Sequence, residues 1–332
     1  MVSRARSVQS CVTAGTDGAR RSAGMERTAV LALALAIDLV WGEPPPAWHP
    51  VVWIGRLISS LEERAPRDGA VAQLASGVWL TGLTVAACCL AGMVVERALG
   101  RLPMWLRVLL AAWALKTLLS VRMLAESVAA VEHALARGNV AEARARLLAL
   151  VSRDRSGLTA TQCASAAIES LAENLTDSCA APALAYALAG LPGAAAYRAA
   201  NTLDAMIGYR GRYEYLGKAA ARLDDLLNLI PARLSAAALV AGAALAGADW
   251  RSAVRVARRH AGRPASPNAG WPMAAMAGAL GVCLEKPGHY RLGAPTREPH
   301  ARDIARARAI FRPAMVLCFL AAMVLAWLRR MR

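Results

Sequence analysis

The sequence predicts an all-α, polytopic membrane protein with about four spans, buried or re-entrant helices, and cytoplasmic polar segments. Three observations support this class. Hydrophobic residues make up 57% of the 332 positions, and the mean hydropathy is +0.35. The apolar residues also gather in long runs, whereas a membrane-spanning helix needs roughly 20 of them in succession. The candidate runs are residues 28–41, 70–95, 102–121, 178–200, 226–248, 272–284 and 310–328.

Four of these runs are the expected spans. The runs 70–95 and 310–328 meet the length requirement cleanly. The run 226–248 nearly meets it, and 102–121 meets it if two basic side chains are tolerated. Charged groups are costly within a bilayer, so Arg233 counts against the run 226–248, and Arg107 and Lys116 count against 102–121.

Two further runs predict helices that are buried or re-entrant. The run 28–41 is short and contains Asp38, and 178–200 is interrupted by Pro182 and Pro192. Proline within a helix removes a hydrogen bond and introduces a bend. We therefore do not count either run as a span.

The first 24 residues differ in composition from the rest of the chain. Residues 1–24 are rich in Ser, Thr, Gly and Arg and show no apolar periodicity, which predicts a disordered extension before a single membrane domain over 25–332. A signal peptide is the alternative, since Arg27 precedes an apolar stretch. However, no small-residue cleavage site precedes the WGEPPP segment, which disfavours that alternative.

The formal net charge of +16 would suit a nucleic-acid-binding protein, but the distribution of the basic residues favours a different interpretation. They lie mainly between and after the apolar runs, as in residues 249–263 and 329–332. This is the positive-inside pattern of a multi-span protein, and it assigns these segments to the cytoplasmic side. We therefore predict a lipid bilayer as partner and no nucleic acid.

Three carboxylates in the first polar stretch suggest a cation site. Glu169, Glu173 and Asp177 recur at i, i+4 and i+8, which places them on one face of a helix. Like charges at this spacing repel each other, so a neutralising group is needed. Mg²⁺ bound through carboxylates and substrate phosphates would supply it. The alternative is a solvated helix face paired with arginines such as Arg153.

A second polar stretch combines acidic, basic and amide side chains. Asn201 and Asp204 lie at i and i+3, and Lys218, Arg222 and Asp225 follow at i, i+4 and i+7 on a later helix. The latter three could form a salt-bridge ladder, which spacing alone favours. They could also form half of a phosphate site, because arginine offers paired hydrogen bonds to phosphate oxygens.

Other polar residues extend this picture. Asp224 and Asn228 lie at i and i+4 beside the second stretch, and Asn268 opens an Ala- and Gly-rich segment. A capping role for Asn268 is at least as well supported as a role in a site. The sequence contains no P-loop, no nucleophile elbow and no paired metal histidines, and its cysteines are dispersed. General motifs therefore stop at a membrane protein with a polar, cation-assisted site.

Five ordered segments carry a resemblance to a known family. The chain resembles the adenosylcobinamide-phosphate synthases of cobalamin biosynthesis, the CobD/CbiB family, from about Met25 to the C-terminus. Two departures from the family pattern are Glu43, where Asp is usual, and Glu285-Lys286 in place of Gly-Gly. The segments are residues 38–62 (DLVWGEPPPAWHPVVWIGRLISSLE), 151–159 (VSRDRSGLT), 169–177 (ESLAENLTD), 201–234 and 266–282.

The resemblance implies a multi-pass enzyme of the inner membrane whose active site faces the cytoplasm. It implies an amide ligation that joins adenosylcobyric acid to an amino-alcohol phosphate, with ATP as co-substrate, Mg²⁺ as cofactor and other membrane-associated corrinoid enzymes as partners. Two rival classes are a non-catalytic membrane sensor or regulator and a corrinoid transporter. A transporter would favour internal repeats, and none is found in the sequence.

With this chemistry in view, the polar residues take expected roles. Acyl activation by ATP needs cations around the phosphates and a base for the amine. Catalytic roles are expected for Glu173, Asp177, Asp204 and Asp225, and Mg²⁺ ligation for Glu169, Glu173 and Asp177. Phosphate or substrate binding is expected for Arg153, Arg210, Lys218, Arg222, Asn201 and Asn268.

Overall fold

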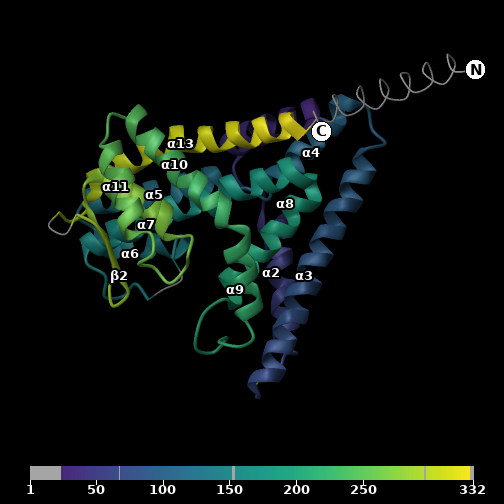
Figure 1. The fold of residues 1–332 in the computed structure, drawn as a ribbon, viewed down its shortest axis with the longest axis horizontal. Coiled ribbons are helices and arrows are strands. Elements are labelled where there is room, and N and C mark those ends of the chain that lie inside the picture. The colour runs from purple at the N-terminus through teal and green to yellow at the C-terminus, as the bar shows by residue number, and fades with distance from the viewer. Residues whose placement is uncertain (1–23, 67, 152–153, 295–296, 330–332) are drawn as a thin grey trace, which may run out of the picture.

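The computed structural model describes residues 24–66, 68–151, 154–294 and 297–329. It confirms an all-α polytopic membrane protein, with one short β-hairpin added. The predicted disordered extension over residues 1–24 lies outside the described residues, apart from its last position. Residues 24–41 form the first helix. The remaining elements are shown in Figure 1 and given below with their bounds.

Four helical stretches are long and apolar enough to cross a membrane. They are Ala70–Leu99, Met104–Ala136, Ala160–Ile207 and Ala301–Leu328. A fifth candidate is the pair Lys218–Leu227 and Leu229–Leu245, which is bent by 49°. The number agrees with the prediction of about four spans.

The residues that form the candidate spans differ from the prediction in two places. Residues 178–200 belong to the long stretch that begins at Ala160, because an apolar helix precedes them without a break. The stretch contains α7 (Ala160–Leu175), the π-helical η3 (Thr176–Ala180) and α8 (Ala181–Ile207), with a kink at Gly190 (φ 70°). The run 226–248 is the bent pair, in which α10 begins at Leu229 and Pro231 lies in its first turn.

The main body consists of helices that run side by side (Figure 1). Its core is built mainly from α5, α7, α8, α10, α12 and α13, whose small side chains allow close packing. The elements of this body, besides those already given, are α4 (Met104–Lys116), α5 (Val121–Ala136), α6 (Val140–Arg146), η2 (Leu147–Ala149), α10 (Leu229–Leu245), α11 (Trp250–His260), α12 (Gly270–Leu280) and α13 (Ala301–Leu328).

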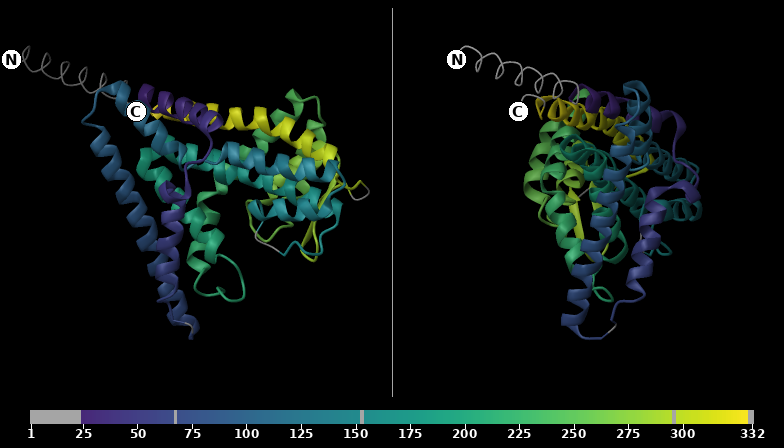
Figure 2. Two further views of the ribbon diagram at one scale, coloured as in Figure 1. Left: turned by 180° about the vertical axis from the view of Figure 1, so that it is seen from behind. Right: turned by 90° about the vertical axis from the view of Figure 1, so that its right-hand side faces the viewer.

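Helices α2 (Pro50–Glu62), α3 (Ala70–Leu99) and α9 (Lys218–Leu227) project from one side of this body (Figure 2). They enclose a second, smaller core with part of α8. The short η1 (Pro46–Trp48) precedes α2. Helix α3 passes α8 closely at Gly92, where a Cβ atom would lie 2.7 Å from the Cα of Pro192. A larger residue at Gly92 would therefore separate the two helices.

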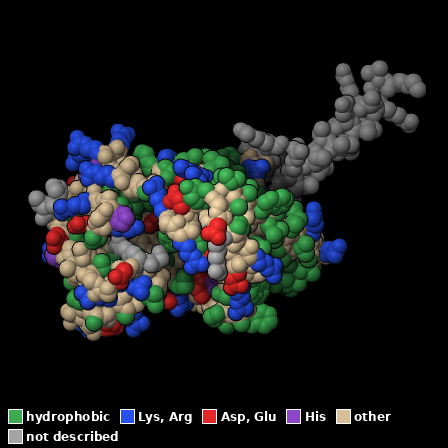
Figure 3. All heavy atoms as spheres, turned by 90° about the horizontal axis from the view of Figure 1, so that it is seen from below, with side chains coloured by type: hydrophobic (Ala, Val, Ile, Leu, Met, Phe, Trp, Pro, Cys, Tyr) green, Lys and Arg blue, Asp and Glu red, His purple; other side chains and the backbone are tan. Residues whose placement is uncertain are grey.

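One face of the molecule shows how apolar and charged side chains divide. In Figure 3, hydrophobic side chains gather on the right half, whereas basic and acidic side chains lie on the left and in the centre. Helix α3 contributes many exposed apolar side chains, among them Val78, Leu90 and Val94. An exposed apolar helix of this length is typical of a lipid-facing span.

The segment 38–62, which carries part of the family resemblance, anchors the first helix to α5. Asp38 is fully buried, and its Oδ2 accepts hydrogen bonds from the backbone N–H groups of Val121 (3.1 Å) and Arg122 (2.9 Å). A carboxylate at a helix N-terminus satisfies free N–H groups and complements the helix dipole. The run 28–41 is thus a helix, and its charged residue, Asp38, caps the N-terminus of α5.

The predicted run 272–284 divides into a helix and a strand. Helix α12 ends at Leu280 because Gly281 adopts a left-handed conformation (φ 66°). Strand β1 (Cys283–Lys286) then pairs antiparallel with β2 (Tyr290–Gly293), with Cys283 opposite Gly293. This hairpin is not part of the predicted all-α class.

Candidate functional site

A polar cleft of about 630 Å³ lies where α7 and α8 approach α9, the segment before it and the β-hairpin. This volume falls within the range of small-molecule sites, roughly 300–1,000 Å³. Eight of the predicted site residues line it: Glu173, Asp177, Asp204, Asp225, Arg210, Lys218, Arg222 and Asn268. Residues far apart in the sequence therefore meet at one site, as the resemblance implied.

The acidic side of the cleft depends on the π-helical segment. Glu173 lies near the end of α7, Asp177 within η3 and Asp204 near the end of α8. A π segment carries one extra residue per turn and often occurs at functional sites. Asp204 packs against Gly208, where a Cβ atom would overlap its carboxylate. The glycine is therefore needed for the chain to turn beside Asp204.

Asp224 lines the cleft and is one functional candidate that the sequence analysis did not place among the site residues. Its Oδ2 accepts a hydrogen bond from Asn228 Nδ2 (2.9 Å), and its Oδ1 lies 3.5 Å from Asn201 Nδ2. The Tyr197 hydroxyl in turn donates to Asn228 Oδ1 (2.9 Å). Arg198 Nη1 lies 3.3 Å from Asn201 Oδ1. Asp224 is thus oriented by the side-chain amides of Asn228 and Asn201. Tyr197 and Arg198 fix these amides in turn.

Asn201 differs from its predicted place. It is absent from the residues that line the cleft, and its side chain contacts Asp224, which does line it. The spacing of Asp224 and Asn228 at i and i+4 was the available sequence signal for this network. It could not be told apart from an ordinary helix-end contact without the neighbouring Tyr197.

Basic side chains come from two parts of the chain. Arg210, Lys218 and Arg222 lie after α8 and on α9, and Lys286 comes from β1. Arg222 Nη1 lies 3.5 Å from Asp225 Oδ2, so one rung of the predicted salt-bridge ladder exists. The Arg222 side chain remains 76% exposed and is accessible to a ligand.

Lys286 and His289 were missed by sequence reasoning, although both line the cleft. Both belong to the hairpin, and Lys286 is part of the Glu285-Lys286 pair that stands where Gly-Gly is usual in the family, so for Lys286 that departure was the available signal. Altogether six acidic and four basic side chains line the cleft. Such a surface suits ligands that carry both charges, or phosphates together with a divalent cation.

Glu169 requires a correction. Its predicted position on one face with Glu173 and Asp177 does not bring it into the cleft lining. It is buried beneath the hairpin, where Ser165 Oγ donates to its Oε1 (2.8 Å) and Tyr290 Oη lies 3.2 Å from its Oε2. The helical spacing was correct, but the hairpin covers this part of α7. Glu169 therefore ties the hairpin to α7.

Two other predicted residues have different outcomes. Arg153 lies outside the described residues. Asn268 lines the cleft, but its amide is engaged: Nδ2 donates to the Asp225 carbonyl oxygen (2.7 Å), and Oδ1 accepts from Arg233 Nη1 (3.0 Å). It ties the segment before α12 to α9 and α10, and its side chain does not cap α12.

The acidic side chains do not form a ready metal site. Within the part of the chain that the structure describes, no three His, Cys, Asp or Glu side chains are grouped to hold a metal ion. The predicted trio of Glu169, Glu173 and Asp177 is not assembled. The donor set still fits Mg²⁺ that arrives with nucleotide phosphates, because Mg²⁺ usually takes one or two carboxylates and completes its shell with phosphates and water.

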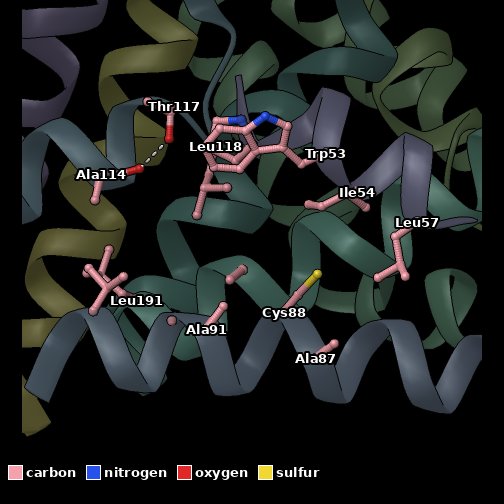
Figure 4. A pocket seen from close by; sticks show the side chains of 14 residues that line it. Trp53, Ile54, Leu57, Ala87, Cys88, Ala91, Ala114, Thr117, Leu118 and Leu191 are labelled. Carbon is pink, nitrogen blue, oxygen red and sulfur yellow. Dashed lines mark hydrogen bonds between the residues drawn. The ribbon is translucent and has the colours of Figure 1, made fainter. Parts of the chain in front are cut away.

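A second cavity is almost wholly apolar. It has a volume of about 340 Å³ and lies between α2, α3, α4 and α8, with Trp53, Leu57 and Ala91 among its walls (Figure 4). Because it has few groups that could recognise a polar substrate, the polar cleft is the candidate site.

The comparisons with known proteins agree with the resemblance. The family model described as CobD/Cbib protein matches residues 31–317. The chain belongs to this CobD/Cbib family. No solved structure gave a significant match.

Its CobD/Cbib relatives include three proteins named cobalamin biosynthesis protein CobD. The one from Dehalococcoides mccartyi is 41% identical over 269 residues, which cover 81% of this chain and 87% of the relative. The one from Rhodobacter capsulatus is 40% identical over 307 residues, covering 88% and 95%. The one from Klebsiella pneumoniae is 40% identical over 285 residues, covering 84% and 88%.

Proposed function

We propose that this protein is the adenosylcobinamide-phosphate synthase of cobalamin biosynthesis. It would join adenosylcobyric acid to an amino-alcohol phosphate such as (R)-1-aminopropan-2-ol O-phosphate in an ATP-dependent ligation. Membership of the CobD/Cbib family and the names of its relatives support a role in this pathway. The observation that carries the ligase assignment is a single cleft lined by both carboxylates and cations.

The proposed chemistry has two steps. An oxygen of the substrate carboxylate attacks the γ-phosphorus of ATP, which gives an acyl phosphate and releases ADP. The amine nitrogen of the second substrate then attacks the acyl carbon, phosphate leaves, and the nitrogen loses a proton. The sum is an amide, ADP, phosphate and a proton. Both steps transfer or release phosphoryl groups, so they need cationic partners and a proton acceptor.

The cleft side chains supply these functions. Arg210, Lys218 and Arg222 are placed to bind phosphoryl oxygens, and guanidinium groups can do so with two hydrogen bonds each. Asp177 and Asp204 are the candidates for accepting the amine proton. When bound with ATP, Mg²⁺ would neutralise phosphate charge, and Glu173 and the oriented Asp224 are candidates to hold it.

The orientation of the cleft toward the cytoplasm is supported by the contact of its β-hairpin with α11 and the segment after it. This helix carries the basic segment that the positive-inside rule assigns to the cytoplasm. Arg263 Nη1 donates to the carbonyl oxygen of Arg291 (2.6 Å), and His260 Nδ1 accepts from the N–H of Gly293 (3.0 Å). The same hairpin contributes Lys286 to the cleft. The basic helix and the cleft therefore lie on the same side of the protein. We propose that this is the cytoplasmic side of the inner membrane.

The test is a reconstituted reaction. Detergent-solubilised protein is incubated with adenosylcobyric acid, aminopropanol phosphate, ATP and Mg²⁺, and the condensed corrinoid is detected by mass spectrometry. Omission of ATP or of the amine should each remove the product. Ethanolamine phosphate and threonine phosphate are tested in parallel, since the amine is not identified by the cleft. Well-folded protein that forms no product with any amine would favour the sensor or transporter alternatives.

A further inference from the structure

The apolar cavity between α2, α3, α4 and α8 lies among helices that can cross the membrane. Helices α3, α4 and α8 each belong to one of the four stretches that are long and apolar enough to span. Trp53 and Val95 line the cavity, and their side chains remain 48% and 42% exposed. Val95 follows Val94, which belongs to the exposed apolar surface of α3. The cavity therefore opens onto the lipid-facing surface of this helix.

The cavity offers almost no group that could recognise a polar ligand. Of its fourteen lining residues, all of which the structure describes, three carry a polar side-chain atom. Trp53 Nε1 donates to the Ala47 carbonyl oxygen (2.9 Å), and Thr117 Oγ1 donates to that of Ala114 (2.7 Å), as Figure 4 shows for the second bond. The third polar atom, the sulfur of Cys88, is a weak hydrogen-bonding group. The two strong donors of the lining are therefore engaged within the protein.

Small side chains on α3 create the space. Figure 4 shows Cys88 and Ala91 of α3 on one side of the cavity and Trp53 and Leu118 on the other. The residue after Ala91 is Gly92, at which α3 passes α8 closely. Helix α3 is thus held against α8 at Gly92, while its small neighbouring side chains leave room toward α2 and α4.

A cavity of this kind, about 340 Å³ in volume, requires an apolar occupant. Water is disfavoured in it, because a buried water needs about two to four polar partners. Lining atoms that contact nothing lose their dispersion energy. A phospholipid acyl chain is apolar, is flexible enough to follow a space between helices, and is present wherever α3 faces the bilayer. It is therefore the occupant that fits both the lining and the position of the cavity.

We propose that this cavity is a binding site for an acyl chain of a bilayer phospholipid, which enters past Trp53 and Val95 and lies between α2 and α3. The site is separate from the polar cleft and does not depend on the function proposed above. Ile54 belongs both to the lining and to the second core, which also contains Leu203 and Ile207 of α8. The bound chain therefore also supports the packing of α2 against the end of α8.

The experiment uses the full-length protein in detergent, which replaces loosely associated lipid. A phosphatidylcholine with a diazirine in the middle of one acyl chain is added at increasing molar ratios. Irradiation couples the chain to the residues that it touches, and mass spectrometry of peptides locates the products. Unlabelled phosphatidylcholine is the competitor.

Two variants fill the cavity from opposite walls. Ala91→Phe fills it from α3, and Leu57→Trp fills it from α2 and keeps the test decisive if Ala91→Phe folds poorly. Ala86→Phe is the matched control, because Ala86 is also exposed on α3 but is absent from the lining. Circular dichroism compares the helix content of the variants with that of the wild-type protein.

The expected result is labelling that saturates, that is removed by the competitor, and that lies in residues 53–57 and 87–95. Ala91→Phe and Leu57→Trp should each lose most of this labelling, because the larger side chain takes the space of the acyl chain. Ala86→Phe should retain it. Because the labelling does not require turnover, it is decided separately from the proposed function.

Three results would overturn the inference. Labelling spread along the exposed face of α3 without saturation would show ordinary lipid contact and no site. Equal labelling of the wild-type protein and of both filled variants would place the acyl chain elsewhere. Coupling of the cavity residues to a second copy of the chain would show that protein, and not lipid, covers the cavity.

Discussion

Asn228 offers the sharpest test of how the cleft is organised. It is 2% exposed and lies at the junction of α9 and α10. Its amide connects the buried Tyr197 hydroxyl to the Asp224 carboxylate, with both contacts at 2.9 Å. Replacing Asn228 by Ala removes the hydrogen-bond partner of the Tyr197 hydroxyl and the shorter of the two contacts to Asp224.

The expected loss of stability follows from these two bonds. A hydrogen bond between neutral groups contributes about 1 kcal/mol, and one to a charged group about 2 kcal/mol. Asn228→Ala should therefore lower the free energy of unfolding by about 3 kcal/mol. Because Asp224 is then held only by the longer contact to Asn201, we also expect turnover to fall at least about a hundredfold if Asp224 takes part in the reaction.

The measurement combines unfolding in SDS, followed by circular dichroism, with turnover per folded molecule. Asn139→Ala is the control, because Asn139 Oδ1 accepts from the N–H of Glu142 (3.0 Å) as the N-cap of the distant α6. It should cost about 1 kcal/mol of stability without reducing turnover of the folded protein. Equal turnover in Asn228→Ala and wild-type protein would refute the role of the network in placing Asp224.

Three further predictions concern the cleft and the hairpin. Asp177→Asn and Asp204→Asn should each abolish turnover while membrane insertion, measured by fractionation, stays intact; normal turnover in both would move the site elsewhere. Lys286→Ala should raise KM for a phosphate-bearing substrate severalfold, whereas Lys286→Arg should largely retain it. Burial, followed by neighbouring arginines, lowers the pKa of His260 below its usual 6.5. The folded state therefore favours the neutral ring, so the stability it contributes is fully present above pH 6.5 and is lost as the pH falls from 6.5 through the lowered pKa. His260→Gln should flatten this part of the stability profile, and an unchanged acid-side slope would contradict the reasoning.

Sequence reasoning succeeded where one local property decides the structure. Uninterrupted hydropathy identified α3 and the apolar part of α13, because lipid selects strongly for apolar side chains. Helical spacing placed Glu173 and Asp177 on one face, and both line the cleft, although Asp177 lies in the π-helical η3. The resemblance brought the two polar stretches together as candidates for one site, which spacing could not do.

Reasoning from the sequence failed where packing between distant segments decides the outcome. Glu169 has the same spacing as its neighbours, yet a hairpin more than a hundred residues away covers it. Lys286 reaches the cleft through the same hairpin, whose strands are too short to give a periodic signal. Asp224 becomes a candidate only once Tyr197 and Asn228 are seen beside it. The π-helical segment at Thr176 likewise carries no distinctive residue pattern.

That π-helical segment makes the length of the chain between α7 and α8 a fixed quantity. Each residue of an α-helix advances the rotation by about 100°. A deletion of one residue within Thr176–Ala180 would therefore turn Asp204 away from the cleft while leaving every side chain chemically unchanged. The segment between Gly208 and Gly217 is not helical, so a change in its length does not rotate α9 by a fixed angle relative to α8. Natural variation in length is accordingly expected in that segment and not in η3, and engineered insertions should follow the same rule.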